Sequence, residues 1–192
     1  MRWTLPNILS IFRLCAAPVL VGLAFYAQDR AFLILFALAL VSDIVDGKLA
    51  RYLNQTSEFG TKLDSWADFA LYMTVPLDAY WLRNDFVRFH ATVFVAIVLA
   101  YTLPVTLGFF KYSRLTSYHT RGAVLSAYLI GAASFVMFAN GPAWPLQLAT
   151  SVLVLAELEE IAITALLPRW TPNVPTLAAA LRLRGAAASQ PE

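Results

Sequence analysis

The sequence contains little charge, a single cysteine and two histidines, and each shortage excludes a class of protein. Charged residues make up 14% of the 192 residues and hydrophobic residues 59%, and the mean hydropathy is +0.64. A soluble domain carries about 25% charged residues. This chain therefore has too little polar surface to cover a water-facing globule of its size, and we predict an all-α integral membrane protein.

The scarce metal-binding residue types narrow the chemistry further. Cys15 stands alone, so neither an internal disulfide nor a cysteine-based zinc site can be built from this chain. His90 and His119 are far apart in sequence, which argues against a histidine-rich metal centre. The first apolar stretch has no small-residue cleavage site and further apolar stretches follow it, which argues against a cleavable signal peptide.

What the sequence does contain is a series of long apolar stretches separated by polar or turn-forming residues. A helix needs about 20 residues to cross a bilayer. Six segments meet this requirement, and they predict a six-transmembrane-helix bundle: residues 5–27, 31–53, 62–81, 86–110, 122–139 and 144–167. The segment 172–192 is rich in Ala and Pro, and we expect a flexible cytoplasmic tail there.

The positive charges predict the orientation of the bundle. With a cytoplasmic N-terminus, eleven Lys and Arg residues lie on the inner side and three on the outer side, which is the bias expected for cytoplasmic loops. Both termini are then cytoplasmic. We expect the protein to lie in the cell inner membrane. The inner residues are Arg2, Arg13, Lys48, Arg51, Lys62, Lys111, Arg114, Arg121, Arg169, Arg182 and Arg184, and the outer ones are Arg30, Arg83 and Arg88.

Four aspartates interrupt the second and third apolar segments. Asp43 and Asp46 are three residues apart, and Asp64 and Asp68 are four apart, so each pair shares one helix face. The two helices are antiparallel and joined by a short polar turn. The four carboxylates are therefore expected to face one another at similar depth, in a polar cavity that opens to the cytoplasm.

Such a cluster needs positive charge. One aspartate at the centre of a membrane helix costs roughly 2.5–3.5 kcal/mol on insertion scales, and four together repel one another. Two divalent cations would balance the formal charge. Oxygen ligands favour hard ions, so we expect Mg²⁺, with Mn²⁺ as a substitute. Paired metals are a common device for substitution at phosphorus.

Other residues beside the aspartates suggest a phosphate pocket. Gly47 and Gly60 flank the cluster, and a glycine within a helix indicates close approach by another group. Arg51 lies one to two turns beyond Asp46 and could reach a diphosphate with its fork of donors. The alternative for Arg51 is an anchor at the membrane interface.

These residues carry a resemblance. The pattern Asp43-x-x-Asp46-Gly47-x-x-Ala50-Arg51, eight further residues, then Gly60-x-x-x-Asp64-x-x-x-Asp68 resembles the signature of the CDP-alcohol phosphotransferase (CDP-alcohol phosphatidyltransferase) family at every fixed position. The resemblance implies that the four aspartates bind two metals and that Asp68 is also the general base. It also implies that Gly47, Ala50, Arg51 and Gly60 line the CDP pocket, within a catalytic domain of residues 1–171.

The resemblance further implies the substrates. CDP-diacylglycerol donates a phosphatidyl group to an alcohol and CMP leaves, in phospholipid biosynthesis, and the enzyme is expected to be a homodimer. The opening segment from Leu5 to Arg13 is similar to that of bacterial phosphatidylglycerophosphate synthases, which favours glycerol 3-phosphate as the acceptor. Phosphatidylglycerol (as in cardiolipin synthase), serine and inositol phosphate remain alternatives.

Two other groups of charged residues each have two possible interpretations. Lys111, Arg114 and Arg121 in the fourth-to-fifth loop are either ordinary cytoplasmic charge or an acceptor-phosphate site. Three acids in the sixth segment are either paired structurally or used in a substrate cavity: Glu157, Glu159 and Glu160. Asp78 and Asp85 are expected to be outer-surface charges.

Two rivals to the enzyme hypothesis remain. The aspartates could form an ion-pair network with Lys48, Arg51 and Lys62, or they could be the transport site of a divalent-cation transporter. The transporter is disfavoured because no polar path continues through the outer half of the second and third segments.

Overall fold

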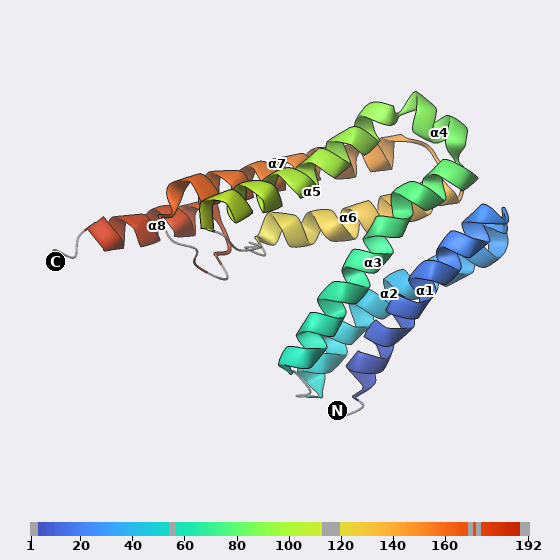
Figure 1. Cartoon of the computed structure of the whole chain (residues 1–192), viewed down its shortest axis with the longest axis horizontal. Coiled ribbons are helices and arrows are strands. Elements are labelled where there is room, and N and C mark those ends of the chain that lie inside the picture. Colours follow the sequence, from blue (N-terminus) through green and yellow to red (C-terminus); the bar gives the residue numbers. More distant parts are fainter. Residues whose placement is uncertain (1–3, 54–56, 113–119, 169–170, 172–173, 189–192) are drawn as a thin grey trace. The chain divides into compact units, whose positions relative to one another are not determined.

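The computed structural model describes residues 4–53, 57–112, 120–168, 171 and 174–188, and within these ranges it contains helices and no strand (Figure 1). The helices are α1 (Leu5–Phe25), α2 (Asp29–Tyr52), α3 (Glu58–Leu82), α4 (Asn84–Phe89), α5 (Ala91–Tyr112), α6 (Arg121–Phe138), α7 (Trp144–Leu166) and α8 (Leu177–Ala188). The prediction of an all-helical protein is therefore confirmed for the described residues.

Within the described residues, three helices are long and apolar enough to cross a bilayer, namely α1, α5 and α6. Of the remaining helices, α2, α3 and α7 have 24, 25 and 23 residues, so their length is sufficient as well. These are the helices that carry the acidic residues of the predicted spans, which lowers their hydropathy. Large apolar side chains such as Ile34, Val95 and Leu155 are exposed, as expected for faces that contact lipid.

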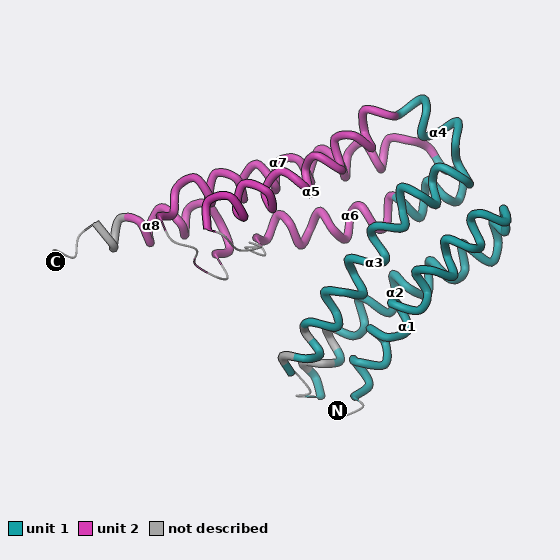
Figure 2. Tube along the Cα trace, in the orientation of Figure 1, with its two compact units in different colours: residues 1–90, 134–141 teal, residues 91–133, 142–192 magenta. Residues whose placement is uncertain are grey.

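The chain forms two compact units, and each is described by itself (Figure 2). The first unit comprises residues 1–90 and 134–141, and therefore holds α1 to α4 and the end of α6. Within it, α1 packs against both α2 and α3. These helices carry buried alanines, among them Ala17 on α1 and Ala67 on α3, and small side chains allow two helices to approach closely.

Two further features hold the first unit together at the end of α3. The rings of Phe32 and Phe36 on α2 pack edge-to-face on Phe138, with centroids 4.6 and 5.4 Å away. Arg83, which follows α3, forms an ion pair with Asp29 at the start of α2 (2.9 Å) and donates to the Phe138 carbonyl. These contacts fix the ends of α2 and α3 opposite the ends that carry the aspartates.

The second unit comprises residues 91–133 and 142–192. In it α5 packs against α7, and α7 packs against α8. Ile163 and Leu167 form a small buried cluster with Val174 and Ala180. The helix α8 lies within the segment 172–192, for which the sequence predicts a flexible tail; the flexibility of this segment stays a prediction.

Two other differences from the prediction concern the bounds of one span and the burial of one aspartate. The predicted span 86–110 is divided, since α4 ends at Phe89 and α5 begins at Ala91. Asp78 was expected on the outer surface, but its side chain is fully buried in α3 (0% exposed). The hydrophobic pattern did not reveal this burial because it depends on which face of α3 the neighbouring helices cover.

Candidate functional site

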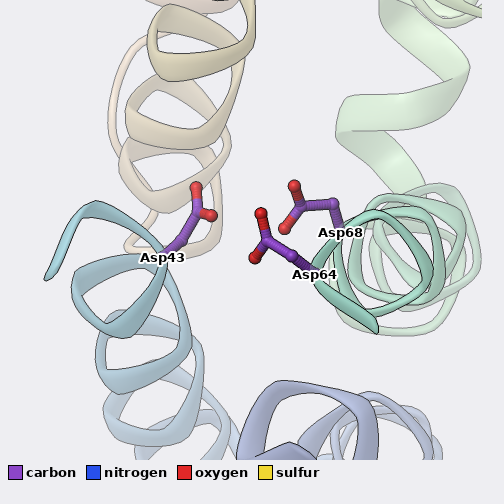
Figure 3. A group of neighbouring side chains, drawn as sticks. All are labelled: Asp43, Asp64 and Asp68. Atoms are coloured by element: carbon purple, nitrogen blue, oxygen red, sulfur yellow. The ribbon is translucent and has the colours of Figure 1, made fainter. Parts of the chain in front are cut away.

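The four aspartates meet in the first unit, as their spacing predicted. Asp43 and Asp46 lie on α2, and Asp64 and Asp68 lie near the start of α3. Asp43, Asp64 and Asp68 each offer one carboxylate oxygen, and these oxygens lie within 4.8 Å of one another. Figure 3 shows Asp64 and Asp68 pointing from α3 toward Asp43 on α2. Helical spacing of three and four residues produces this arrangement, because it places each pair on one face.

A guanidinium occupies the centre of the cluster. Arg13 of α1 is fully buried (0% exposed), and its Nη1 donates to Asp43 and Asp68. Its Nη2 donates to Asp46 and Asp64. Each terminal nitrogen thus bridges one carboxylate of α2 and one of α3. The five residues carry a formal charge of −3, so the arginine compensates the acids only in part.

The aspartates differ in their access to the outside of the unit. The side chain of Asp46 is 3% exposed and that of Asp43 is 21% exposed. On α3, Asp64 is 42% and Asp68 is 35% exposed. The cluster therefore has a closed side formed by α2 and an open side formed by α3, and a ligand would approach the carboxylates of α3 first.

A row of buried polar residues runs along the start of α1 and ends at Arg13. Thr4 caps the helix, its hydroxyl accepting from the Asn7 amide (3.5 Å), and Pro6 lies in the first turn, where proline is compatible with a helix. Asn7, Ser10 and Arg13 are three residues apart and all buried. They lie on the face of α1 that packs against its neighbours, and they are the polar positions of the opening segment.

The contact of Arg13 with the aspartates was not predicted from the sequence, where Arg13 counted as cytoplasmic charge and as the last residue of the opening segment. A usable signal was present, because Arg13 is the only charged residue between Leu5 and Ala27. A charge within a membrane helix is costly unless it faces a partner inside the protein. Four acids on the next two helices are the partner that this rule requires. The cation found in this cluster is Arg13, which the rival ion-pair hypothesis did not include. The side chains of Lys48 and Arg51 lie outside the described residues, so their part in an ion-pair network stays a prediction.

Of the four predicted CDP-pocket residues, Gly60 alone has surroundings that the structure describes. Gly60 lies in the first turn of α3, where a Cβ would stand 2.7 Å from Asn7 Oδ1 and 3.1 Å from Ser57 Oγ. The group that approaches Gly60 closely is therefore a side chain of α1. Gly47, Ala50 and Arg51 fall within the bounds of α2, but their side-chain surroundings lie outside the described residues. The pocket they would form with Gly60 stays a prediction.

The predicted acceptor-phosphate residues belong to the second unit. Lys111 Nζ donates to the carbonyls of Thr164 (2.7 Å) and Ala165 (3.0 Å) at the end of α7. A cation there also faces the negative end of the helix dipole. Arg121 begins α6 with an exposed side chain, and Arg114 and His119 lie outside the described residues. Their role in binding an acceptor stays a prediction.

Among the three glutamates of α7, Glu159 has surroundings that differ from those of the other two. Glu159 Oε1 accepts from the backbone amide of Leu177 (2.8 Å), so it caps the start of α8. This is a contact that neither interpretation of the sequence anticipated. Glu157 and Glu160 are buried, and they share one face of α7.

The aspartate cluster fits a hard divalent cation. The four side chains supply carboxylate oxygens, which are the donors that Mg²⁺ and Mn²⁺ prefer. The carboxylates also converge on a position that already holds a positive group, the Arg13 guanidinium. The residues present are therefore compatible with a metal, and the formal charge of −3 leaves room for further positive charge.

Comparison with known proteins assigns the chain to a family. A family model described as CDP-alcohol phosphatidyltransferase matches residues 3–168. Over 75 residues the chain is 45% identical to a CDP-diacylglycerol–glycerol-3-phosphate 3-phosphatidyltransferase of Cereibacter sphaeroides. This alignment covers 37% of this chain and 34% of that protein. Over 67 residues it is 45% identical to a cardiolipin synthase (CMP-forming) of Rattus norvegicus, covering 34% and 22%.

A longer alignment of 134 residues, 28% identical, relates it to a CDP-diacylglycerol–serine O-phosphatidyltransferase of Mycobacterium bovis and covers 66% of this chain and 43% of that protein. The chain thus spans less than half the length of each of these three relatives. No solved structure matches it significantly. Because the family model covers most of the sequence, including all four aspartates, the chain belongs to the CDP-alcohol phosphatidyltransferase family.

Proposed function

We propose that this protein transfers a phosphatidyl group from CDP-diacylglycerol to glycerol 3-phosphate and releases CMP. The observation that carries the proposal is the convergence of Asp43, Asp64 and Asp68 from two helices at the spacing of the family signature. The choice of glycerol 3-phosphate is supported by the name of the Cereibacter sphaeroides relative and by the similar opening segment of α1.

In this proposal the four aspartates hold two Mg²⁺ ions, with Mn²⁺ as a substitute. Two divalent cations would balance the formal charge of the four carboxylates. When bound, such ions hold the attacking and leaving oxygens and neutralise the charge that develops at phosphorus. The closed side of the cluster, formed by Asp43 and Asp46, would then anchor the ions, and the open side would face the substrates.

Asp68 is the proposed general base. It accepts the proton of the acceptor hydroxyl while the hydroxyl oxygen attacks the β-phosphorus of the CDP-lipid. A new P–O bond forms to the acceptor as the bond to CMP breaks. The partial exposure of Asp68 allows an alcohol to reach its carboxylate (35% exposed), as a base must lie within hydrogen-bond reach of its proton. The CDP moiety would be bound by Arg51, Gly47, Ala50 and Gly60. The acceptor phosphate would be bound by Lys111, Arg114 and Arg121.

The proposed setting is the cell inner membrane, crossed by α1, α2, α3, α5, α6 and α7. The shortest of the six has 18 residues, which corresponds to about 27 Å of helix, close to the thickness of the hydrocarbon core. Both termini and the polar cavity would face the cytoplasm. Residues 1–171 would form the catalytic domain of a homodimer, with 172–192 as a cytoplasmic tail that carries α8.

An acceptor screen tests the function. Purified protein in detergent receives CDP-diacylglycerol and Mg²⁺, and then glycerol 3-phosphate, phosphatidylglycerol, serine or inositol phosphate separately. We expect CMP and phosphatidylglycerophosphate with glycerol 3-phosphate, abolished by EDTA and by Asp64→Asn. Asp85→Asn, which removes an exposed acid of α4, is the matched control and should leave the rate unchanged. CMP release no faster with glycerol 3-phosphate than with water alone refutes the acceptor.

The transporter hypothesis is tested in the same preparation. In proteoliposomes an enzyme forms CMP without moving divalent ions across the bilayer. A Mg²⁺ or Mn²⁺ flux that depends on Asp43 and Asp68, without CMP formation, would instead support a transporter.

A further inference from the structure

Arg13 lies where a cation bound by the four aspartates would lie. Its two terminal nitrogens contact one oxygen from each carboxylate: Oδ1 of Asp43, Asp64 and Asp68, and Oδ2 of Asp46. A metal bound by the same oxygens would be surrounded by the same side chains. The guanidinium and a divalent cation cannot share this position, because like charges at contact distance repel strongly.

We propose that Arg13 is a built-in counter-cation: it holds the aspartate cluster together when no metal is bound, and it competes with the metal for the carboxylates. This inference rests on the proposed function, because it assumes that the aspartates bind a metal. It assigns to α1 a part in the site that the signature on α2 and α3 does not contain. Arg13 thereby sets the metal affinity, and its role is to position the ligands rather than to react.

The choice of arginine fits this task. A guanidinium carries its charge at every physiological pH and presents donors on two terminal nitrogens, so one side chain can serve four carboxylates. A lysine would present one point charge. In this structure each terminal nitrogen of Arg13 links α2 to α3, so the arginine would hold the two helices together before a metal binds.

The guanidinium also has an unsatisfied hydrogen-bond donor, which favours its release from the cluster. Arg13 Nε is buried and makes no hydrogen bond within the described part of the chain. A buried donor without a partner is destabilising. The arginine therefore pairs its terminal nitrogens at the expense of its third donor position. Together with the residual charge of −3 on the cluster, this defect makes replacement by a doubly charged ion favourable.

The alternative is that Arg13 is a permanent structural tie, which stays in place when metal binds. The two hypotheses predict opposite effects of neutralising the residue. If Arg13 competes with the metal, its removal leaves a more negative site and the metal binds more tightly. If Arg13 only orders the ligands, its removal disorganises the cluster and the metal binds more weakly.

The experiment measures metal binding without substrate, in the full chain purified in detergent. Free Mn²⁺ is followed by its electron paramagnetic resonance signal in wild type, Arg13→Gln, Arg13→Lys and the control Arg83→Gln, which breaks a different ion pair of the same unit. For Arg13→Gln we expect the Mn²⁺ dissociation constant to fall at least about tenfold, which is about 1.4 kcal/mol. Arg13→Lys should be intermediate, and Arg83→Gln should match wild type.

A second measurement uses the melting temperature of the same proteins. In EDTA, Arg13→Gln should melt below wild type, because the four acids lose their counter-cation, and Mg²⁺ should raise its melting temperature more than it raises that of wild type. Should Arg13→Gln fail to fold without metal, Arg13→Lys decides the question, since its single ammonium releases part of the cluster. Unchanged or weaker Mn²⁺ binding by the Arg13 variants overturns the inference.

The outcomes separate this inference from the proposed function. Tight Mn²⁺ binding by wild type and its variants with equal affinity removes the competition by Arg13 but leaves the enzyme intact. No saturable Mn²⁺ binding by any variant overturns the metal site, and with it this inference. CMP formation in the acceptor screen tests the enzyme without reference to Arg13.

Discussion

Replacing Gly60 with alanine tests whether α1 and α3 approach each other as closely as the structure indicates. The new Cβ would stand 2.7 Å from Asn7 Oδ1, about 0.7 Å short of the 3.4 Å at which ordinary contact begins. It would also stand 3.1 Å from Ser57 Oγ. That oxygen caps α3 by accepting from the Gly60 amide (3.0 Å). Both neighbours would have to move, and Asn7 is buried on α1.

The expected loss of stability follows from these contacts. Forcing extra volume into a packed contact costs about 1–3 kcal/mol, and weakening a helix cap costs about 1 kcal/mol. Alanine gains up to about 1 kcal/mol in a helix relative to glycine. We therefore expect Gly60→Ala to lower the free energy of unfolding by about 1–3 kcal/mol. Because Asp64 follows one turn later, the shift of α3 should also disturb the aspartate cluster.

Gly22→Ala is the matched control, since a Cβ at Gly22 of α1 meets nothing within 4 Å. That variant should gain up to about 1 kcal/mol from helix propensity. Both proteins are unfolded thermally in detergent with EDTA, and CDP-lipid binding is measured separately with Mg²⁺. Equal stability of the two variants would refute the close contact with Asn7. Weakened CDP-lipid binding by a Gly60→Ala protein of normal stability would show instead that the glycine faces the ligand.

Three further substitutions test the site and its surroundings. Asp68→Asn should retain CDP-lipid binding while turnover falls by about 10²–10⁴, the usual contribution of a general base; near-normal turnover would exclude it as the base. Asp43→Ala should weaken Mn²⁺ and CDP-lipid binding together, by at least about tenfold, since even the outer partners of a metal contribute that much; unchanged binding of the CDP-lipid would contradict the ligand assignment. Asp78→Asn should raise the free energy of unfolding by about 1 kcal/mol, because it removes an ionisable group from a fully buried position where no cation is described beside it. A loss of stability in Asp78→Asn would mean that the carboxylate has a partner.

Much of the site could be predicted because it depends on local spacing. Asp43 and Asp46, and then Asp64 and Asp68, share helix faces wherever the helix lies, and a short connection makes α2 and α3 antiparallel. The long apolar stretches and the polar breaks between them predicted the long helices to within a few residues at most ends. The prediction that the cluster needs positive charge also followed from electrostatics alone.

The features that were not predicted depend on contacts between residues far apart in sequence. Arg13 is 55 residues from Asp68; its isolated charge in an apolar helix indicates a partner inside the protein, but no local pattern says which later helices supply that partner. The burial of Asp78 has the same origin. The helix α8 follows Pro175 in an alanine-rich segment, where composition suggested a mobile tail, and it is fixed by Glu159 and by packing on Ile163 and Leu167.

The pairing of Arg13 with acids on two later helices has a consequence for biosynthesis. The first helix leaves the ribosome before Asp64 and Asp68 have been translated, so its arginine enters the bilayer without those partners. An arginine at the centre of a helix costs about 2.5–3.5 kcal/mol on insertion scales. The most apolar window of α1 has a mean hydropathy of 2.2 even with Arg13 included, so the apolar residues of the helix offset this cost. The helix α1 can therefore insert before its partners. The charge of Arg13 is then compensated first by the aspartates of α2 and afterwards by those of α3.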